Sequence, residues 1–80
     1  MTQDRSELDR IRWQCRRGLL ELDLLLNRFV ERELDGLDPG QLQVFKELLN
    51  EQDPSLLAWV MEQEEVPGRY DFLIRRLRQV

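Results

Sequence analysis

Hydrophobic residues recur along this chain at the three- and four-residue spacing of amphipathic helices, without the alternation expected of strands. The spacing predicts five helical segments separated by turn signals. The first covers about 6–16 and the second about 19–34. The second is the longest and most apolar, so we expect it to be central to the core. Its main apolar stripe is Leu19, Leu22, Leu26, Phe29 and Val30.

The third and fourth segments each begin with an Asp-Pro pair. Asp38 and Asp53 are the predicted N-caps, and Gln41 is placed to complete a capping box with Asp38. The third segment ends near residue 50, and the fourth carries a broad apolar face that includes Trp59. A Val-Pro-Gly turn then precedes the fifth segment. Its stripe is Tyr70, Leu73, Ile74 and Leu77.

Short connections between these helices predict an all-α fold, a compact five-helix antiparallel bundle. A chain of 80 residues is enough for one small domain, so we expect a single helical domain over 1–80, with loose ends at 1–5 and 79–80. The composition, 41% hydrophobic and 35% charged, suits an amphipathic helical domain rather than a disordered chain.

Charge is unevenly distributed around the net value of -4. Residues 1–17 contain five arginines and three acids (+2), and residues 18–68 contain three bases and 12 acids (-9). Residues 69–80 contain four arginines and one acid (+3). The acidic middle argues against nucleic acid and against an anionic membrane surface as partners.

Segment lengths and cysteine content bear on the compartment. No stretch approaches the ~20 apolar residues of a membrane span, so no direct membrane insertion is expected. The first residues resemble neither a signal peptide nor a transit peptide. One cysteine excludes an internal disulfide and fits a reducing compartment. We therefore expect a cytoplasmic protein.

The residue types needed for most catalytic chemistry are missing. The chain has no histidine and only Cys15 as a thiol, which excludes a zinc site of the usual ligands, and no phosphate-binding glycine motif occurs. Cys15 is either a thiol activated by Arg12 and Arg16 or a buried small hydrophobic residue beside Ile11, and the second reading is favoured. No catalytic residue and no metal site are predicted, so a binding protein is expected rather than an enzyme.

The stretch RWQCRRGLLELD, residues 12–23, places Gly18 between two predicted helices. Gly18 lacks Cβ, which would permit a left-handed turn and a close approach by another backbone. Tryptophan and arginine are enriched at binding hot spots, and a mixed apolar and charged patch is typical of interfaces. Six residues around this junction are predicted to face away from the core: Arg10, Trp13, Arg17, Leu20, Glu21 and Leu24.

A purely structural interpretation of the same stretch has equal weight on spacing alone. In that interpretation Gly18 only ends the first helix. Arg17 and Glu21 form an exposed ion pair four residues apart, and Trp13 packs onto the core. Both interpretations stay open at the level of the residues.

The residues RRGLLELD resemble the signature of the succinate dehydrogenase assembly factor 2 family, the SdhE (YgfY) flavinylation factors. The family's RGxxE motif corresponds to Arg17, Gly18 and Glu21, and the similarity extends from Trp13 to Asp23. Two later stretches, LDPGQLQVFKELL and DPSLLAWVM, resemble the family as well. The likeness thus covers most of the chain.

The chain departs from that family in one place. Many members follow the tryptophan-bearing helix with a glycine and then a proline, whereas this chain has EQEEVPG, with no glycine before Val66. The departure affects the expected loop between the fourth and fifth helices and leaves the RGxxE motif intact.

The resemblance implies an SdhE-like domain that acts as an assembly chaperone and not as an enzyme. It would promote covalent attachment of FAD to a histidine of the flavoprotein subunit of succinate dehydrogenase, and of fumarate reductase where present. The client protein would hold the FAD, and the factor itself, a monomer in the bacterial cytoplasm, would bind no cofactor stably. The residues expected to bind the client are Arg17, Gly18, Glu21, Arg10, Trp13, Leu20, Asp23 and Leu24.

Three other functions stay open. The domain could be a helical adaptor or regulator of another cytoplasmic partner, such as a toxin-antitoxin component. It could carry free FAD, although so small a bundle has little room for a dinucleotide pocket. It could also be an enzyme that uses Cys15.

Overall fold

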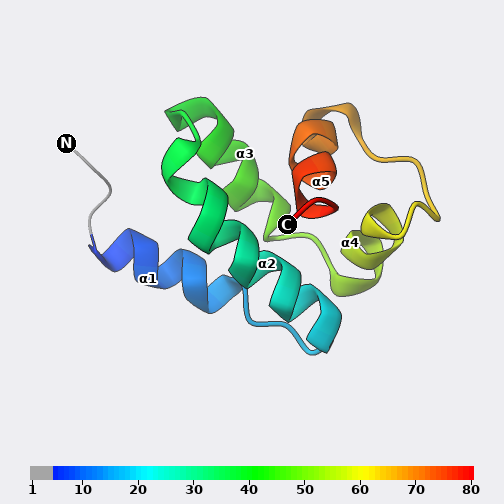
Figure 1. Ribbon diagram of the computed structural model, residues 1–80, viewed down its shortest axis with the longest axis horizontal. Helices are drawn as coiled ribbons and strands as arrows, with labels where there is room; N and C mark the ends of the chain where they lie inside the picture. The colour runs from blue at the N-terminus through cyan, green and yellow to red at the C-terminus, as the bar shows by residue number, and fades with distance from the viewer. Residues whose placement is uncertain (1–4) are drawn as a thin grey trace.

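A computed structural model describes residues 5–80 of the chain, with side chains from Glu7 onward. The loose end expected at 1–5 therefore lies outside the described residues, apart from Arg5. Figure 1 shows α2 (Leu20–Glu33) crossing the middle of the molecule, with the other helices around it. These are α1 (Arg5–Gln14), α3 (Pro39–Leu48), α4 (Asp53–Val60) and α5 (Asp71–Leu77), with 3-10 turns η1 (Leu34–Gly36) and η2 (Gly68–Tyr70).

The core forms around α2, as its apolar stripe predicts. Phe29 of α2 is fully buried, and its ring centroid lies 4.9 Å from that of Phe45 in α3. Trp59 of α4 packs against Tyr70 of η2, with ring centroids 5.6 Å apart. Contacts of α2 with both α4 and α5 complete the core. Burial of this kind stabilises by about 25 cal/mol for each Å² of apolar surface removed from water.

The two Asp-Pro pairs behave differently. At α3 the predicted capping box forms: the Asp38 carboxylate accepts from the Gln41 N–H, and the Gln41 side chain accepts from the Asp38 N–H. At α4 the prediction is wrong. The N-cap position belongs to Gln52, no side chain caps the helix, and Asp53 is already helical. Its carboxylate is engaged by an arginine distant in sequence.

The end of α4 has the geometry of a Schellman motif. The Gln63 N–H donates to the Ala58 carbonyl at 2.8 Å, and the Glu62 N–H donates to that of Trp59 at 3.2 Å. Glu62, with φ of 61°, takes the left-handed position that is usually glycine. The missing glycine noted in the sequence thus coincides with a strained helix end.

The predicted helical class is confirmed: the described residues form five α-helices and no strand. The antiparallel arrangement stays a prediction. Val80 is partly buried against the core. None of the described helices combines the length and apolar character needed to cross a membrane.

Candidate functional site

Large apolar side chains are exposed where α1 ends and α2 begins, and the three most exposed of them belong to the predicted site. Trp13 is 70% exposed, Leu20 71% and Leu24 49%. We call these three residues the apolar patch. The Arg16 guanidinium lies over the Trp13 ring, 5.5 Å from its centroid, which places a positive charge on its π face. The interpretation in which Trp13 packs onto the core is therefore wrong.

Helix periodicity explains why this patch faces solvent. Ile11 and Cys15 are buried, and a residue two positions from each points to the opposite side of the helix, so Trp13 points outward. On α2 the buried residues Leu22 and Leu26 alternate with the exposed positions of the patch. Large apolar side chains exposed near one another mark interaction surfaces in many proteins.

Charged residues of the predicted site lie on the same two helices as the patch. Arg10 and Glu21 are exposed, and neither forms an ion pair within the described part of the chain. Glu21 lies in the first turn of α2, where the helix dipole favours a carboxylate. Asp23 is half-buried and accepts a hydrogen bond from Asn27 Nδ2 at 2.8 Å. Glu21 is thus the acid of the motif that is left available to a partner.

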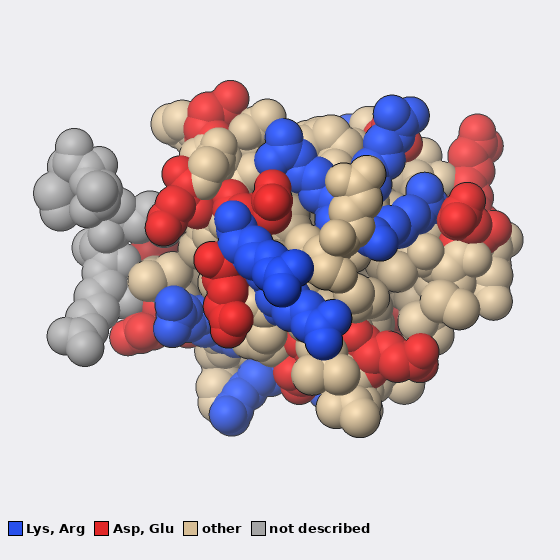
Figure 2. Space-filling view, viewed as in Figure 1, with Lys and Arg blue, Asp and Glu red and all other residues tan. Residues whose placement is uncertain are grey.

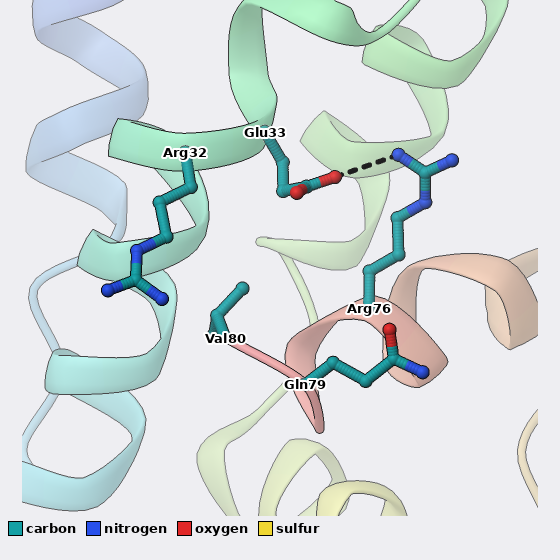
Figure 3. A pocket seen from close by; sticks show the side chains of 5 residues that line it. All are labelled: Arg32, Glu33, Arg76, Gln79 and Val80. Atoms are coloured by element: carbon teal, nitrogen blue, oxygen red, sulfur yellow. Dashed lines mark hydrogen bonds and ion pairs between the residues drawn. The ribbon is translucent and has the colours of Figure 1, made fainter.

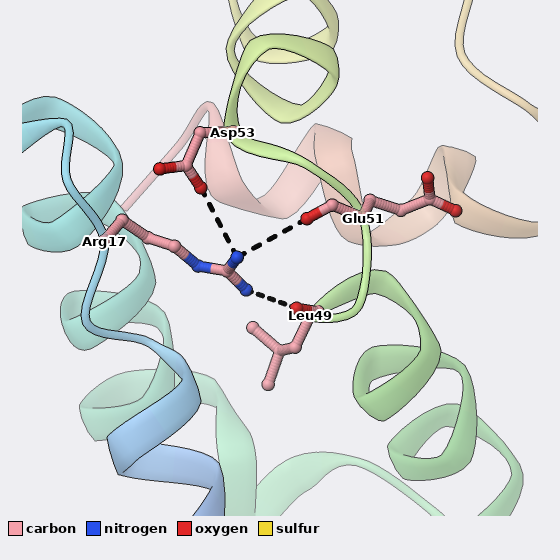
Figure 4. A network of polar contacts seen from close by, with 4 residues as sticks. All are labelled: Arg17, Leu49, Glu51 and Asp53. Atoms are coloured by element: carbon pink, nitrogen blue, oxygen red, sulfur yellow. Dashed lines mark hydrogen bonds and ion pairs between the residues drawn. The ribbon is translucent and has the colours of Figure 1, made fainter.

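Arg17, in contrast, turns toward the protein, and the predicted outward orientation is wrong. Its side chain is only 13% exposed. One guanidinium nitrogen, Nη1, donates to Asp53 Oδ1 at 3.3 Å and to the Glu51 carbonyl at 3.4 Å. The other, Nη2, donates to the Leu49 carbonyl. Figure 4 shows the guanidinium held between the connection from α1 to α2 and the connection from α3 to α4.

The ion pair between Arg17 and Glu21 that belongs to the purely structural interpretation does not form. Arg17 lies in the connection before α2, so the two residues do not share a helix. The polar cluster continues instead through Glu51, whose Oε2 accepts from the Tyr70 hydroxyl at 2.9 Å. Burial of Tyr70 and this hydrogen bond raise the pKa of its hydroxyl. The cluster therefore joins the motif to the connection between α3 and α4, to the start of α4 and to η2.

Gly18 is exposed and carries no constraint from its own fold. An added Cβ would meet only Asp53 Oδ2, at 4.0 Å, an ordinary contact. No described glycine has a positive φ, so Gly18 does not make the left-handed turn that its missing Cβ would permit. Gly18 does not end α1 either, because that helix stops at Gln14. Its remaining distinction is an uncovered backbone beside the apolar patch.

Cys15 is fully buried in the core. Burial raises the pKa of its thiol to about 11, although nearby Arg17 lowers it in part. A thiol in this state is a poor nucleophile at neutral pH, which confirms the small-hydrophobe interpretation. Across residues 5–80 no group of acidic or thiol side chains is placed to hold a metal ion.

Sequence reasoning missed the acceptors of Arg17. The carbonyls of Leu49 and Glu51 give no sequence signal, because any residue supplies a carbonyl. Leu19 is exposed, so the prediction that places it in the core stripe is wrong. It occupies the N-cap position of α2, where its extended backbone turns the side chain away from the helical register.

A family model, Sdh5, described as flavinator of succinate dehydrogenase, matches residues 9–80. The FAD assembly factor SdhE of Legionella pneumophila (strain Paris) is 53% identical over 62 residues, covering 78% of each chain. That of Idiomarina loihiensis is 42% identical, covering 86% of this chain and 82% of the relative. That of Coxiella burnetii is 40% identical, covering 89% and 88%. No solved structure matches significantly.

Proposed function

The chain belongs to the family of succinate dehydrogenase flavinators, and we propose that it promotes covalent attachment of FAD to the flavoprotein subunit of succinate dehydrogenase, and of fumarate reductase where present. The client holds the FAD and supplies the histidine that forms the linkage. The factor acts as a monomeric chaperone in the bacterial cytoplasm and keeps no cofactor of its own.

The observation that carries the proposed mode of action is the apolar patch together with Glu21, which has no ion-pair partner among residues 5–80. Trp13, Leu20 and Leu24 are exposed although each would gain from burial, and a tryptophan of this kind is a typical anchor of protein interfaces. We infer that the patch docks on the client next to its FAD site. Truncating one such anchor typically costs about 2 kcal/mol or more of binding free energy.

Glu21 supplies the polar contact of the docked complex. Its carboxylate is free to accept hydrogen bonds from the client, and Arg10 at the rim adds a compensating charge. Gly18 lets the client backbone approach the connection between α1 and α2. Arg17 and Asp23 act from within the factor, because both are bonded to their own chain. They hold the connection and the first turns of α2 in place.

The factor would speed the reaction by orienting the reacting groups of the client. A client held with histidine and isoalloxazine aligned loses little entropy on reaching the transition state, and alignment can contribute up to about 7–11 kcal/mol in ideal cases. The factor needs no catalytic group of its own for this effect. That is consistent with a chain that has no histidine.

Co-expression of the client with variants of the factor tests the proposal. Glu21→Ala, Trp13→Ala and Gly18→Arg should each lower covalent flavin, measured by in-gel fluorescence of the denatured client. Gly18→Ala is the sharpest variant, because the fold accommodates its Cβ and only a partner in close contact would not.

Met61→Ala is the matched control, since Met61 is an exposed apolar residue outside the patch and should leave flavinylation unchanged. Normal covalent flavin with all the patch variants would overturn the proposed surface. Loss of covalent flavin with Met61→Ala alone would instead place the client-binding surface at the end of α4.

A further inference from the structure

The exposed face of α2 continues past the apolar patch. Leu20, Leu24, Arg28 and Arg32 follow one another at four-residue intervals, and all four are exposed. Each interval of four residues advances about 40° around a helix, so the four side chains form one gently winding stripe. The last two turns of the stripe present arginine where the first two present leucine. We call Arg28 and Arg32 the arginine pair.

The arginine pair is not neutralised by its own protein. Neither residue forms an ion pair or hydrogen bond within the described range 5–80. In Figure 2 basic side chains form a band across the middle of the molecule, over the position of α2 in Figure 1. Two guanidinium groups one helical turn apart repel each other mildly unless an anion is placed between them.

A hollow of about 430 Å³ opens at the end of this stripe. Figure 3 shows Arg32 on one side of it and Arg76 of α5 on the other. Arg76 Nη1 already binds Glu33 Oε1 at 2.8 Å, whereas Arg32 is free to donate. The hollow is lined by Arg32, Glu33, Arg76, Gln79 and Val80.

A carboxylate fits these donors best. The planar guanidinium group binds a carboxylate through two parallel N–H donors, and the Gln79 amide adds a neutral donor nearby. The net charge of -4 and Glu33 within the hollow disfavour an extended polyanion such as nucleic acid. A short acidic segment of a folded protein supplies carboxylates and is not an extended polyanion, so it fits the site.

We propose that the arginine pair and the adjoining hollow bind an acidic segment of the same flavoprotein client that docks on the apolar patch, so that the exposed stripe on α2 contributes to both halves of the interface. This inference rests on the proposed function. The stripe divides the work: the leucine half supplies buried apolar area, and the arginine half steers and orients the approaching client. A charge contact at the rim acts mainly on the rate of association and is weakened by salt.

Binding kinetics with the purified flavoprotein subunit of succinate dehydrogenase test this inference. The double variant Arg28→Gln/Arg32→Gln should lower the association rate constant about tenfold at roughly 50 mM salt and much less at roughly 500 mM. The double variant Arg69→Gln/Arg75→Gln removes the same charge from η2 and α5 and should change the rate less than about twofold.

The outcomes separate the two proposals. If the wild-type factor binds normally and the two double variants have equal association rate constants, the inference is overturned and the proposed function is not. A loss of rate that persists undiminished at high salt also overturns it, because an electrostatic contact would be screened. Absence of binding by the wild-type factor overturns the proposed function, and this inference with it. A membrane or nucleic-acid ligand captured by the arginine pair in place of the client would overturn it as well.

Discussion

At the scale of single residues, Trp13 and Cys15 show how two nearby positions can have opposite environments. Trp13 lies in the last turn of α1 and Cys15 directly follows that helix, so their side chains point to opposite sides. Cys15 closes the core beside Ile11, and Trp13 stands in solvent. Burial therefore explains why the thiol is chemically silent and why the indole is available to a partner.

Burial of Cys15 makes the stability of the protein sensitive to alkaline pH. The folded thiol has a pKa of about 11, against 9.0 for an ordinary thiol. Between these values the unfolded chain loses the proton and the folded chain keeps it. The free energy of unfolding should thus fall as pH rises from about 9 to 11, by about 2–3 kcal/mol in total. Urea denaturation across this range measures the effect.

Cys15→Ala is the control for this prediction. The variant should be less stable at all pH values because of the lost packing, but its stability should decline less between pH 9 and 10 than that of the wild type. Tyr70, whose pKa is raised as well, adds a decline in both proteins at higher pH. Parallel pH profiles for the two proteins would contradict the assignment to Cys15.

The outward-facing residues of the site were predictable because helical spacing alone decides them. The apolar patch and Glu21 follow from the 3.6-residue period of α1 and α2. Arg17 was not predictable in this way. It lies outside both helices, and its acceptors are 32 to 36 positions further along the chain. Such long-range pairing leaves no periodic signal in a single sequence.

At the scale of the elements, local signals gave most helix boundaries to within about two residues. The predicted 19–34 helix is observed as Leu20–Glu33, and the capping box at Asp38 sets the start of α3 as expected. The start of α4 shows the limit of such signals. An aspartate before proline is a good cap by propensity, yet a buried guanidinium is a stronger partner for its carboxylate.

The left-handed Glu62 at the end of α4 gives a testable prediction. A non-glycine residue in this conformation costs roughly 1 kcal/mol, which glycine avoids at the expense of some chain entropy. Glu62→Gly should therefore raise the free energy of unfolding by about 0.5–1 kcal/mol in urea denaturation.

Glu64→Gly provides the comparison, because Glu64 is an exposed loop residue without a positive φ. Only the entropic cost of glycine applies there, so the variant should be neutral or slightly less stable. Equal effects of the two substitutions would show that the conformation of Glu62 is not strained.

At the scale of the whole molecule, the polar cluster around Arg17 joins segments that are remote in sequence. Its members are Arg17, Leu49, Glu51, Asp53 and Tyr70. It ties the connection that carries Gly18 to the connection between α3 and α4, and Glu51 extends the tie to η2 through Tyr70. These hydrogen bonds thereby fix the connection between α1 and α2, which lies next to the apolar patch in the sequence. A flexible connection would lose entropy whenever a client ordered it.

Removal of this tie should affect both stability and function. Arg17→Ala leaves Asp53 and two carbonyls without their donor, so we expect the free energy of unfolding to fall by about 2 kcal/mol in urea denaturation. Arg17→Lys should restore only part of it, since one ammonium group cannot match the planar fork. Flavinylation at a temperature where the variant is folded should also fall, because the surface is less ordered.

Arg75→Ala serves as the control for an ordinary surface ion pair. Its partner Asp71 lies one turn away on α5, and the two side chains are 70% and 47% exposed. Such pairs contribute at most about 0.5 kcal/mol. If Arg17→Ala were as mild as Arg75→Ala, the cluster would have no structural role, and Arg17 would again be a candidate for direct contact with the client.

The opposite environments of the two tryptophans have an optical consequence. Trp59 is packed against Tyr70 in the core, whereas Trp13 is in water under Arg16. Fluorescence emission from the folded protein therefore combines a blue-shifted component and a red-shifted, easily quenched one. Iodide quenching would report on Trp13 alone, and its loss on addition of a client would signal docking without any attached dye. The emission of Trp59 would meanwhile report that the factor stays folded.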